Sequence, residues 1–191
     1  MKDRISQIMK ESISTKQLLL EDDAIIHQLQ VVSQLTIDTF KGGGKVLFCG
    51  NGGSASDAQH LAAELSGRFL ISRDPLFAEA LHVNPSYLTA VANDFSFDEV
   101  YARILKAKGR PGDLLIALST SGNSPNVIRA AEEAKRIGIP VIGFTKRDGG
   151  KLKGLSAHCF CVPTDSTARA QEAHILLGHI ICELTEGALF G

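Results

Sequence analysis

Residues 46 to 67 read Val-Leu-Phe-Cys-Gly-Asn-Gly-Gly-Ser-Ala-Ser-Asp-Ala-Gln-His-Leu-Ala-Ala-Glu-Leu-Ser-Gly, which predicts a strand, a glycine turn and a helix in succession. The first four residues are apolar, as in a buried strand, and the glycines that follow allow a turn that no side chain crowds. Ser54 and Asp57 are spaced as in a capping box at the start of a helix. A helix that begins after such a turn directs its unpaired backbone N–H groups toward an anion.

The helix predicted at 54–67 separates two polar side chains from its apolar face. At about 100° per residue, four apolar residues cluster on one side, namely Ala58, Leu61, Ala62 and Leu65. His60 and Glu64 lie one turn apart on the opposite side, so they face solvent or a cleft. Such a pair is commonly a simple surface pair, but it can also bind a divalent metal ion. Its place in a helix that begins on a glycine turn favours a functional role.

Composition is that of a single globular domain. The 191 residues are enough to bury a core, and 44% hydrophobic with 21% charged residues is ordinary for such a domain. The net charge of −1 gives no electrostatic indication of binding to nucleic acid or to an anionic membrane. No apolar run approaches the roughly 20 residues of a transmembrane helix, and the N-terminus lacks the apolar core of a signal peptide.

The cysteines are predicted to be reduced, buried thiols of a cytoplasmic protein. They lie mostly in apolar segments and match no zinc-binding spacing; they are Cys49, Cys159, Cys161 and Cys182. The sequence Cys-Phe-Cys would place two of these side chains on the same face of a strand.

Short apolar segments alternate with helical segments after residue 45, which predicts an α/β fold with a doubly wound, mostly five-stranded parallel sheet flanked by helices. The expected strands are 45–49, 77–83, 113–118, 139–144 and 157–162, and the expected helices are 54–67, 86–92, 97–108, 125–137 and 167–189. Residues 2–41 predict two further helices, which three consecutive glycines end. We therefore expect an N-terminal helical arm, 1–44, followed by one α/β domain, 45–191. The apolar face of the arm would pack on its own core or on a partner subunit.

Ligands of such sheets bind outside the carboxyl ends of the strands, so the loop after strand 113–118 is the next candidate. It holds several hydroxyl groups, from Ser119, Thr120, Ser121 and Ser124. Ser124 is a good N-cap residue and Pro125 a good first helical residue. Hydroxyl donors beside a helix N-terminus, without a lysine, suit a phosphate monoester better than a transferable triphosphate. A plain polar turn is the alternative.

The helix expected at 167–189 carries further polar candidates. Its main apolar face is predicted to consist of Ala173, Leu176, Leu177, Ile180 and Leu184. Gln171 and His179 lie off that face and about 12 Å apart along the axis, from eight residues at about 1.5 Å each. Both could touch one small ligand only by reaching toward each other, which suggests a site that draws on more than one subunit.

Two nucleotide-binding interpretations are weaker. Residues 50–55 fit a loose dinucleotide fingerprint, but the second strand ends in Leu-His-Val-Asn, without the acidic residue that would hold a ribose. A P-loop is excluded, because no Gly-Lys-Ser/Thr follows the glycines.

Three motifs together resemble those of the sugar isomerase (SIS) domain. They are Gly-Asn-Gly-Gly-Ser at 50–54, Ser-Thr-Ser-Gly-Asn-Ser at 119–124 and Thr-Ala-Arg-Ala-Gln-Glu at 167–172. Within that superfamily the whole chain, with its length and N-terminal helices, is most similar to the phosphoheptose isomerase family. The resemblance implies a cytoplasmic homotetramer, with active sites shared between subunits, that isomerises sedoheptulose 7-phosphate to D-glycero-D-manno-heptose 7-phosphate. This is the first step toward nucleotide-activated heptose for lipopolysaccharide core or other bacterial glycans.

The resemblance also implies which residues act. The substrate contacts fall on Asn51, Gly52, Gly53, Ser54, Glu64, Asn93, Asp94, Ser119, Thr120, Ser121, Ser124 and Gln171. One Zn²⁺ per subunit would be held by His60, Glu64, Gln171 and His179, and the base and the acid would be Glu64 and His179. Some members place an acidic residue immediately before the arginine of the third motif. Ala168 stands there in this chain, with Asp165 or Thr167 as the substitute.

The chemistry of aldose–ketose isomerisation needs such groups. A carboxylate removes a proton next to a carbonyl to form an enediol and returns it to the neighbouring carbon, while a histidine moves the hydroxyl proton. The alternatives are an isomerase for another phosphosugar, or a noncatalytic SIS protein that binds a replication initiator, as the DnaA initiator-associating proteins do. The resemblance suggests that the noncatalytic proteins lack the glutamate at position 64, so its presence favours an enzyme.

Overall fold

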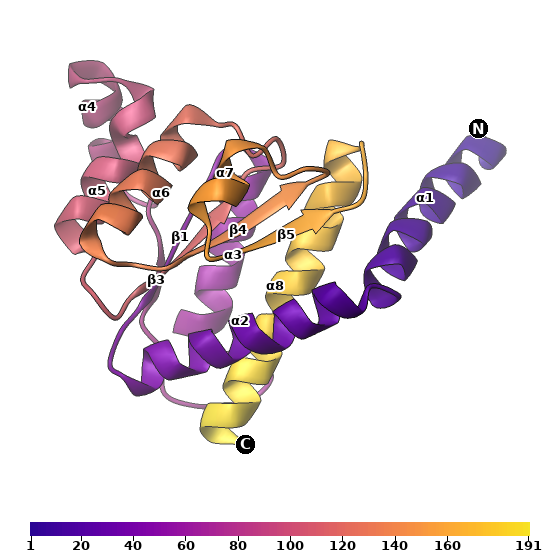
Figure 1. Ribbon diagram of the computed structural model, residues 1–191, viewed down its shortest axis with the longest axis horizontal. Coiled ribbons are helices and arrows are strands. Elements are labelled where there is room, and N and C mark those ends of the chain that lie inside the picture. Colours follow the sequence, from indigo (N-terminus) through magenta and orange to yellow (C-terminus); the bar gives the residue numbers. More distant parts are fainter.

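The computed structural model describes residues 1–191 and has a parallel sheet between two layers of helices (Figure 1). The strands are β1 (Val46–Gly50), β2 (Ala78–Ala80), β3 (Leu114–Leu118), β4 (Val141–Lys146) and β5 (His158–Val162). They pair in the order β2-β1-β3-β4-β5, and every pair is parallel. The predicted α/β class and five-stranded parallel sheet are therefore confirmed.

The helices cover both faces of the sheet. They are α1 (Lys2–Leu20), α2 (Asp23–Lys41), α3 (Gly53–Ser66), α4 (Pro85–Asp94), α5 (Val100–Lys108), α6 (Pro125–Ile137), α7 (Gly150–Leu155) and α8 (Thr167–Phe190), with a 3-10 turn at Phe97–Glu99. Alternate strand residues point to opposite faces. On β1, Val46 and Phe48 pack with α2, α3 and α8, while Leu47 and Cys49 pack with α5 and α6. The three central strands, β1, β3 and β4, are thus buried on both sides.

Two elements differ from the prediction. The second strand has three residues rather than seven, because β2 is an edge strand whose pairing with β1 ends at Ala80. Asn84 then caps α4, its side chain accepting a hydrogen bond from the backbone of Tyr87. The six-residue helix α7 was not predicted, since a segment this short and glycine-rich shows no helical periodicity.

The predicted capping box is wrong. Helix α3 begins at Gly53, one residue earlier than expected, after Gly52 adopts a φ of 55° that favours glycine. Ser54 therefore lies inside the first turn, where it is buried and caps no backbone group. One carboxylate oxygen of Asp57 is buried without a hydrogen-bond partner.

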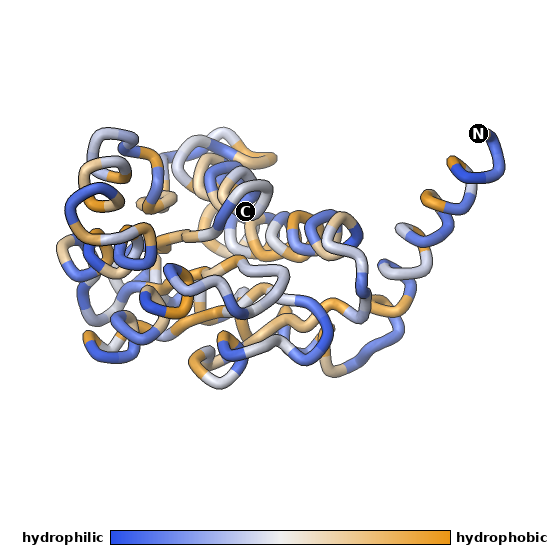
Figure 2. Tube along the Cα trace, turned by 90° about the horizontal axis from the view of Figure 1, so that it is seen from above, coloured by the Kyte–Doolittle hydropathy of each residue, from blue (hydrophilic) through white to orange (hydrophobic).

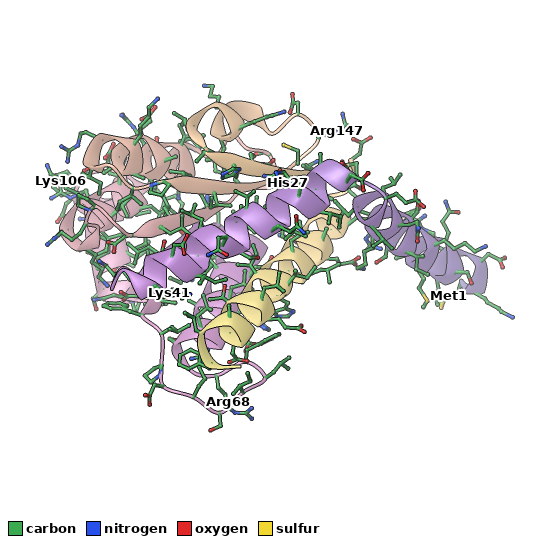
Figure 3. The ribbon with its side chains drawn as sticks, turned by 60° about the horizontal axis from the view of Figure 1, so that its bottom comes forward. Met1, His27, Lys41, Arg68, Lys106 and Arg147 are labelled. Carbon is green, nitrogen blue, oxygen red and sulfur yellow. The ribbon has the colours of Figure 1, made fainter.

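The N-terminal helix α1 projects from the rest of the chain (Figures 1 and 2). Figure 3 shows Met1 at its outer end, far from α2. Several of its large apolar side chains are exposed, namely Ile5, Ile8, Met9, Ile13, Leu18 and Leu20. Helix α2, in contrast, contributes Ile25, Leu29 and Val32 to the main core. The division at residue 44 stays a prediction.

Helix α8 lies against α2 and α3 rather than on the surface. The predicted apolar face was partly wrong, because Leu176 and Leu184 are exposed, whereas His174 and Gly178 are buried. A Cβ at Gly178 would overlap the side chain of Leu61, so glycine permits close contact between α3 and α8. By length and composition α8 could cross a membrane, contrary to the sequence-based expectation, but a mostly buried core helix has the same character.

All four cysteines are free, as expected. Cys49 and Cys182 are buried, but Cys159 and Cys161 are only half-buried, so the expectation of four buried thiols is wrong for this pair. Strand β5 lies at the edge of the sheet, where a side chain has fewer neighbours to cover it.

Candidate active site

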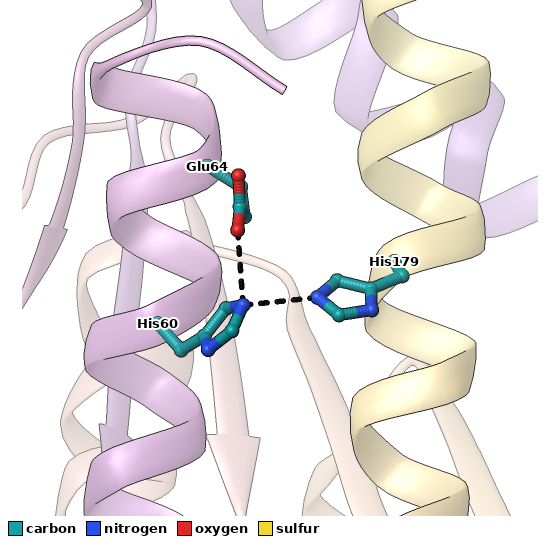
Figure 4. A group of neighbouring side chains, drawn as sticks. All are labelled: His60, Glu64 and His179. Carbon is teal, nitrogen blue, oxygen red and sulfur yellow. Dashed lines mark hydrogen bonds and ion pairs between the residues drawn. The ribbon is translucent and has the colours of Figure 1, made fainter. Parts of the chain in front are cut away.

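Three polar side chains from two helices meet beside the main core (Figure 4). His60 and Glu64 come from α3, and His179 comes from α8. The Nε2 atom of His60 lies 2.9 Å from Glu64 Oε1 and 3.1 Å from His179 Nε2. The three residues belong to one chain, so this part of the site needs no second subunit.

The donor atoms of this trio suit a divalent metal ion. They all lie within 4.8 Å of one another. Four ligands at about 2.0–2.1 Å from a tetrahedral Zn²⁺ would be about 3.3 Å apart, so slight outward movement of the trio would admit the ion. Two imidazoles and one carboxylate are also the donor types that zinc prefers. The trio therefore fits a zinc site with room for a further ligand.

The trio is open to solvent, because the side chains of His60 and Glu64 are 49% and 25% exposed. Burial lowers the pKa of His179, and the charge of His60 lowers it further, although Glu64 opposes both. His179 is thus held neutral at physiological pH, with a ring nitrogen able to accept a proton. Burial raises the pKa of Asp57, one turn before His60, against the opposing charge of His60.

The segment after α3 supports the trio, which sequence reasoning missed. The ring of Phe69 lies 5.4 Å from the ring of His179. The guanidinium of Arg73 donates to the backbone oxygen of Glu64 at 2.9 Å and forms a buried ion pair with Glu186 on α8. No motif marks this segment, and its partner lies 113 positions away, so no local sequence signal could have identified it.

The loop from β3 to α6 places its hydroxyl groups close together, as predicted. Ser119 Oγ lies 3.0 Å from Ser124 Oγ and 3.5 Å from Ser121 Oγ. Thr120 is half-buried beside them. Ser124 occupies the N-cap position of α6, but its hydroxyl contacts Ser119 instead of capping the helix. The cluster therefore stands at a helix N-terminus, where an anion is favoured.

The glycine turn lies beside this loop, because β1 and β3 are neighbours. The side-chain amides of Asn51 and Asn126 donate to each other, with N···O distances of 2.8 and 2.9 Å. Gly52 and Gly53 are exposed at the start of α3. The backbone N–H groups of Ser54 and Ala55 donate within the turn, to Asn51 and Gly52, both at 3.0 Å. Asn51 uses much of its side-chain hydrogen-bonding capacity to join the two loops.

Gln171 does not join the trio in this structure. It lies against the first turn of α3, where its Nε2 atom would be 2.5 Å from a Cβ at Gly53. Seven residues of α3, about 10 Å of helix, separate Gly53 from His60. Gln171 is thus near the glycine turn, whereas His179 is near the middle of α3.

Asn93 and Asp94 lie at the end of α4, and the Asn93 amide donates to Asp94 at 2.8 Å on the surface. Nothing in the structure connects them to the trio. Asp165 pairs with Arg147, and Arg169 instead pairs with Glu172 at 2.7 Å. Thr167 and Ala168 are exposed at the start of α8.

Comparisons with known proteins agree with the motifs. A family model described as SIS domain matches residues 9–146. A phosphoheptose isomerase from Clostridium acetobutylicum is 47% identical over 191 residues, covering 100% of this chain and 97% of that protein. One from Mycobacterium tuberculosis is 46% identical over 184 residues, covering 96% and 94% respectively.

Solved structures of two further phosphoheptose isomerases share the fold. The protein from Neisseria gonorrhoeae has a TM-score of 0.91 and 40% identity, covering 97% of this chain and 98% of that chain. The protein from Francisella tularensis has a TM-score of 0.92 and 33% identity, covering 97% of each chain. With its SIS domain and near full-length similarity to these proteins, the chain belongs to the phosphoheptose isomerase family.

Proposed function

We propose that this protein is an isomerase that converts sedoheptulose 7-phosphate to D-glycero-D-manno-heptose 7-phosphate through an enediol. The observation that carries the proposal is the trio of His60, Glu64 and His179, which supplies a carboxylate and a neutral histidine at one place. Family membership supports the substrate. The product would be the first intermediate toward a nucleotide-activated heptose.

In the proposed reaction, Glu64 takes a proton from C1 of the ketose, next to the C2 carbonyl. In the resulting enediolate, His179 takes the proton from O1 and delivers it to O2, while Glu64 returns its proton to C2. No atom is gained or lost, so the product is the aldose. The depressed pKa of His179 supports this role, because a neutral imidazole can accept the hydroxyl proton.

The hydroxyl cluster is proposed to hold the phosphate monoester, through Ser119, Thr120, Ser121 and Ser124. Its place at the N-terminus of α6 supports this, since hydroxyl and backbone donors there converge on one anion. The sugar hydroxyls are proposed to contact residues carried over from the family, namely Asn51, Gly52, Gly53, Ser54, Asn93, Asp94 and Gln171.

We further propose that His60, Glu64 and His179 would hold Zn²⁺. Gln171 is the fourth ligand that the family resemblance implies, but within this chain it lies against Gly53, about 10 Å along α3 from His60. When bound, Zn²⁺ would supply Lewis-acid polarisation of an oxygen. A carboxylate fully engaged by a metal ion cannot also take a proton, so the roles of Glu64 as ligand and as base would compete.

A homotetramer in the cytoplasm is also proposed. The many exposed apolar side chains of α1 support association, because a partner subunit would remove them from water. The free cysteines agree with a reducing compartment.

The decisive test is Glu64→Gln assayed with sedoheptulose 7-phosphate in the presence of zinc. Turnover should fall by about 10²–10⁴-fold, the usual contribution of a general base, while thermal stability and phosphate binding are retained. Glu183→Gln is a matched control, since Glu183 is exposed on α8. Unchanged activity in the first variant would remove Glu64 as the base. No turnover by the unmodified protein would favour a binding role instead.

Subunit mixing tests where the catalytic pair lies. Glu64→Gln and His179→Ala proteins, mixed and verified as hybrids, should regain no activity, because both residues contribute to the same trio within one chain. Recovery of activity would show that the functional pair spans two subunits.

A further inference from the structure

Two thiols lie side by side on the opposite face of the sheet from the trio. Cys159 and Cys161 are on β5, and their Sγ atoms are 3.8 Å apart. Thr145 Oγ1 on β4 is 3.5 Å from the first sulfur and 3.4 Å from the second. Their neighbour Phe160 belongs to the core under α8, so by strand alternation both thiols face α7.

The sulfur spacing matches that of two thiolates on one metal ion. With metal–sulfur bonds of about 2.3 Å, two thiolate ligands of a tetrahedral ion lie about 3.8 Å apart. Both thiols are half-buried and neither is in a disulfide. We propose that the Cys159–Cys161 pair binds one soft divalent cation, of the Zn²⁺ or Cd²⁺ class, with each thiol bound as its thiolate and its proton released to solvent.

The two thiols also influence each other's pKa. The hydrogen bond with Cys159, together with the Thr145 hydroxyl and the charge of Lys153, lowers the pKa of Cys161 to about 6, although burial and Asp148 oppose this. The same hydrogen bond and burial raise the pKa of Cys159. Binding of a cation to the pair would release the thiol protons to solvent.

Cys161 contacts the segment that supports the hydroxyl cluster. A Cβ at Gly149 would lie 2.9 Å from Cys161 Sγ, and a Cβ at Gly122 would overlap the backbone of Gly149. The backbone N–H of Leu152 also donates to the oxygen of Gly122 at 2.9 Å. The 149–152 segment thus lies between the thiols and the 119–124 loop.

Gly149 lies so close to Cys161 that even an added Cβ would crowd the sulfur, so a cation bound on this side of the pair needs more space. We therefore expect the cation to displace residues 149–152 and to loosen the 119–124 loop. If the protein is the proposed isomerase, on which this step rests, a loosened 119–124 loop would bind the phosphate of the substrate less tightly.

Titration with Cd²⁺ tests the site, because cadmium bound to thiolate has an ultraviolet charge-transfer absorption that cadmium on histidine and carboxylate lacks. The intact protein should show this absorption, saturating at one ion per chain. Cys159→Ser and Cys161→Ser should each weaken it strongly, and the double variant should abolish it, whereas Cys182→Ser should not change it. No absorption in the intact protein, or absorption that survives in the double variant, would overturn the proposal.

Hydrogen–deuterium exchange tests the effect on the loop without substrate or turnover. Amides of residues 119–124 should exchange at least about fivefold faster with Cd²⁺ bound, the lower end of usual coupling between two sites. The double cysteine variant should show no such change, which controls for cadmium at the trio. Unchanged exchange in the intact protein would overturn the link between the thiols and the loop.

Discussion

The substitution Glu186→Gln removes one charge at the centre of the segment that supports the trio. The Glu186 carboxylate and the Arg73 guanidinium form an ion pair whose side chains are each 1% exposed. Oε1 accepts hydrogen bonds from the backbone of Phe69 and from Arg73 Nε, both at 2.9 Å. Oε2 accepts from the backbone of Leu70 at 2.6 Å and of Ile71 at 2.9 Å. Glutamine has the same shape but only one oxygen, so two of these four donors would face an NH₂ group.

The expected cost follows from these contacts. A buried donor that loses its acceptor costs about 1–3 kcal/mol, and removing one partner of a buried ion pair costs about 3–5 kcal/mol. These costs overlap, because Arg73 is one of the four donors, and we expect the free energy of unfolding to fall by about 3–5 kcal/mol. That is a large part of the roughly 5–15 kcal/mol that stabilises a domain.

Chemical denaturation of Glu186→Gln, with Glu183→Gln as the exposed control, measures this cost. A loss below about 1 kcal/mol, the scale of an exposed pair, would refute the reasoning.

The pH dependence of the free energy of unfolding gives a second measurement. Burial raises the pKa of Glu186, but hydrogen bonds from residues 69–71 and Arg73 outweigh it, so the folded pKa lies below 4.5. The pair's contribution is lost as pH falls through that value, so the difference between variant and unmodified protein should shrink there.

Two other predictions use the same measurements. Burial lowers the pKa of His174 to about 4, so the unfolded chain takes up a proton below pH 6.5 that the folded chain refuses. The free energy of unfolding should fall by up to about 3 kcal/mol from pH 6.5 to 4, and His174→Gln should flatten this slope. Gly122 and Gly138 both have positive φ, but only at Gly122 would a Cβ meet backbone. Gly122→Ala should therefore destabilise the protein and weaken phosphate binding, whereas Gly138→Ala should cost only about 1 kcal/mol; equal effects would contradict this.

The sheet could be predicted because its strands are continuous apolar segments and its helices follow glycine turns. Strand β1 is buried at every position, which its apolar sequence indicates, and the turn after it is confirmed by the positive φ of Gly52. The start of α3 could not be predicted to the residue, because that φ moves the first turn back and buries Ser54. Local sequence shows which residues can cap a helix, but not which backbone path the turn takes.

The hydroxyl cluster and the His60–Glu64 pair could also be predicted from the sequence, since each depends on residues a few positions apart. His179 is 119 positions from His60, and its place beside that residue depends on how α3 and α8 pack. The apolar face of α8 was predicted partly in the wrong position. Helical periodicity does not show that α8 will approach α3 through a glycine, Gly178. The expectation that Gln171 and His179 must reach toward each other missed that they contact different turns of α3.

The contacts between α3 and α8 explain why the trio forms within one chain. Gly53 faces Gln171, His60 faces His179, and Leu61 faces Gly178, so the two helices run in the same direction at nearly constant register. Parallel strands require this, because each helix begins at the carboxyl end of its strand and returns along the sheet. Gly178 then sets the separation, and a larger residue there would move His179 away from His60. The packing of Gly178 against Leu61 in the core therefore places the two histidines close together, although the side chain of His60 is itself exposed to solvent.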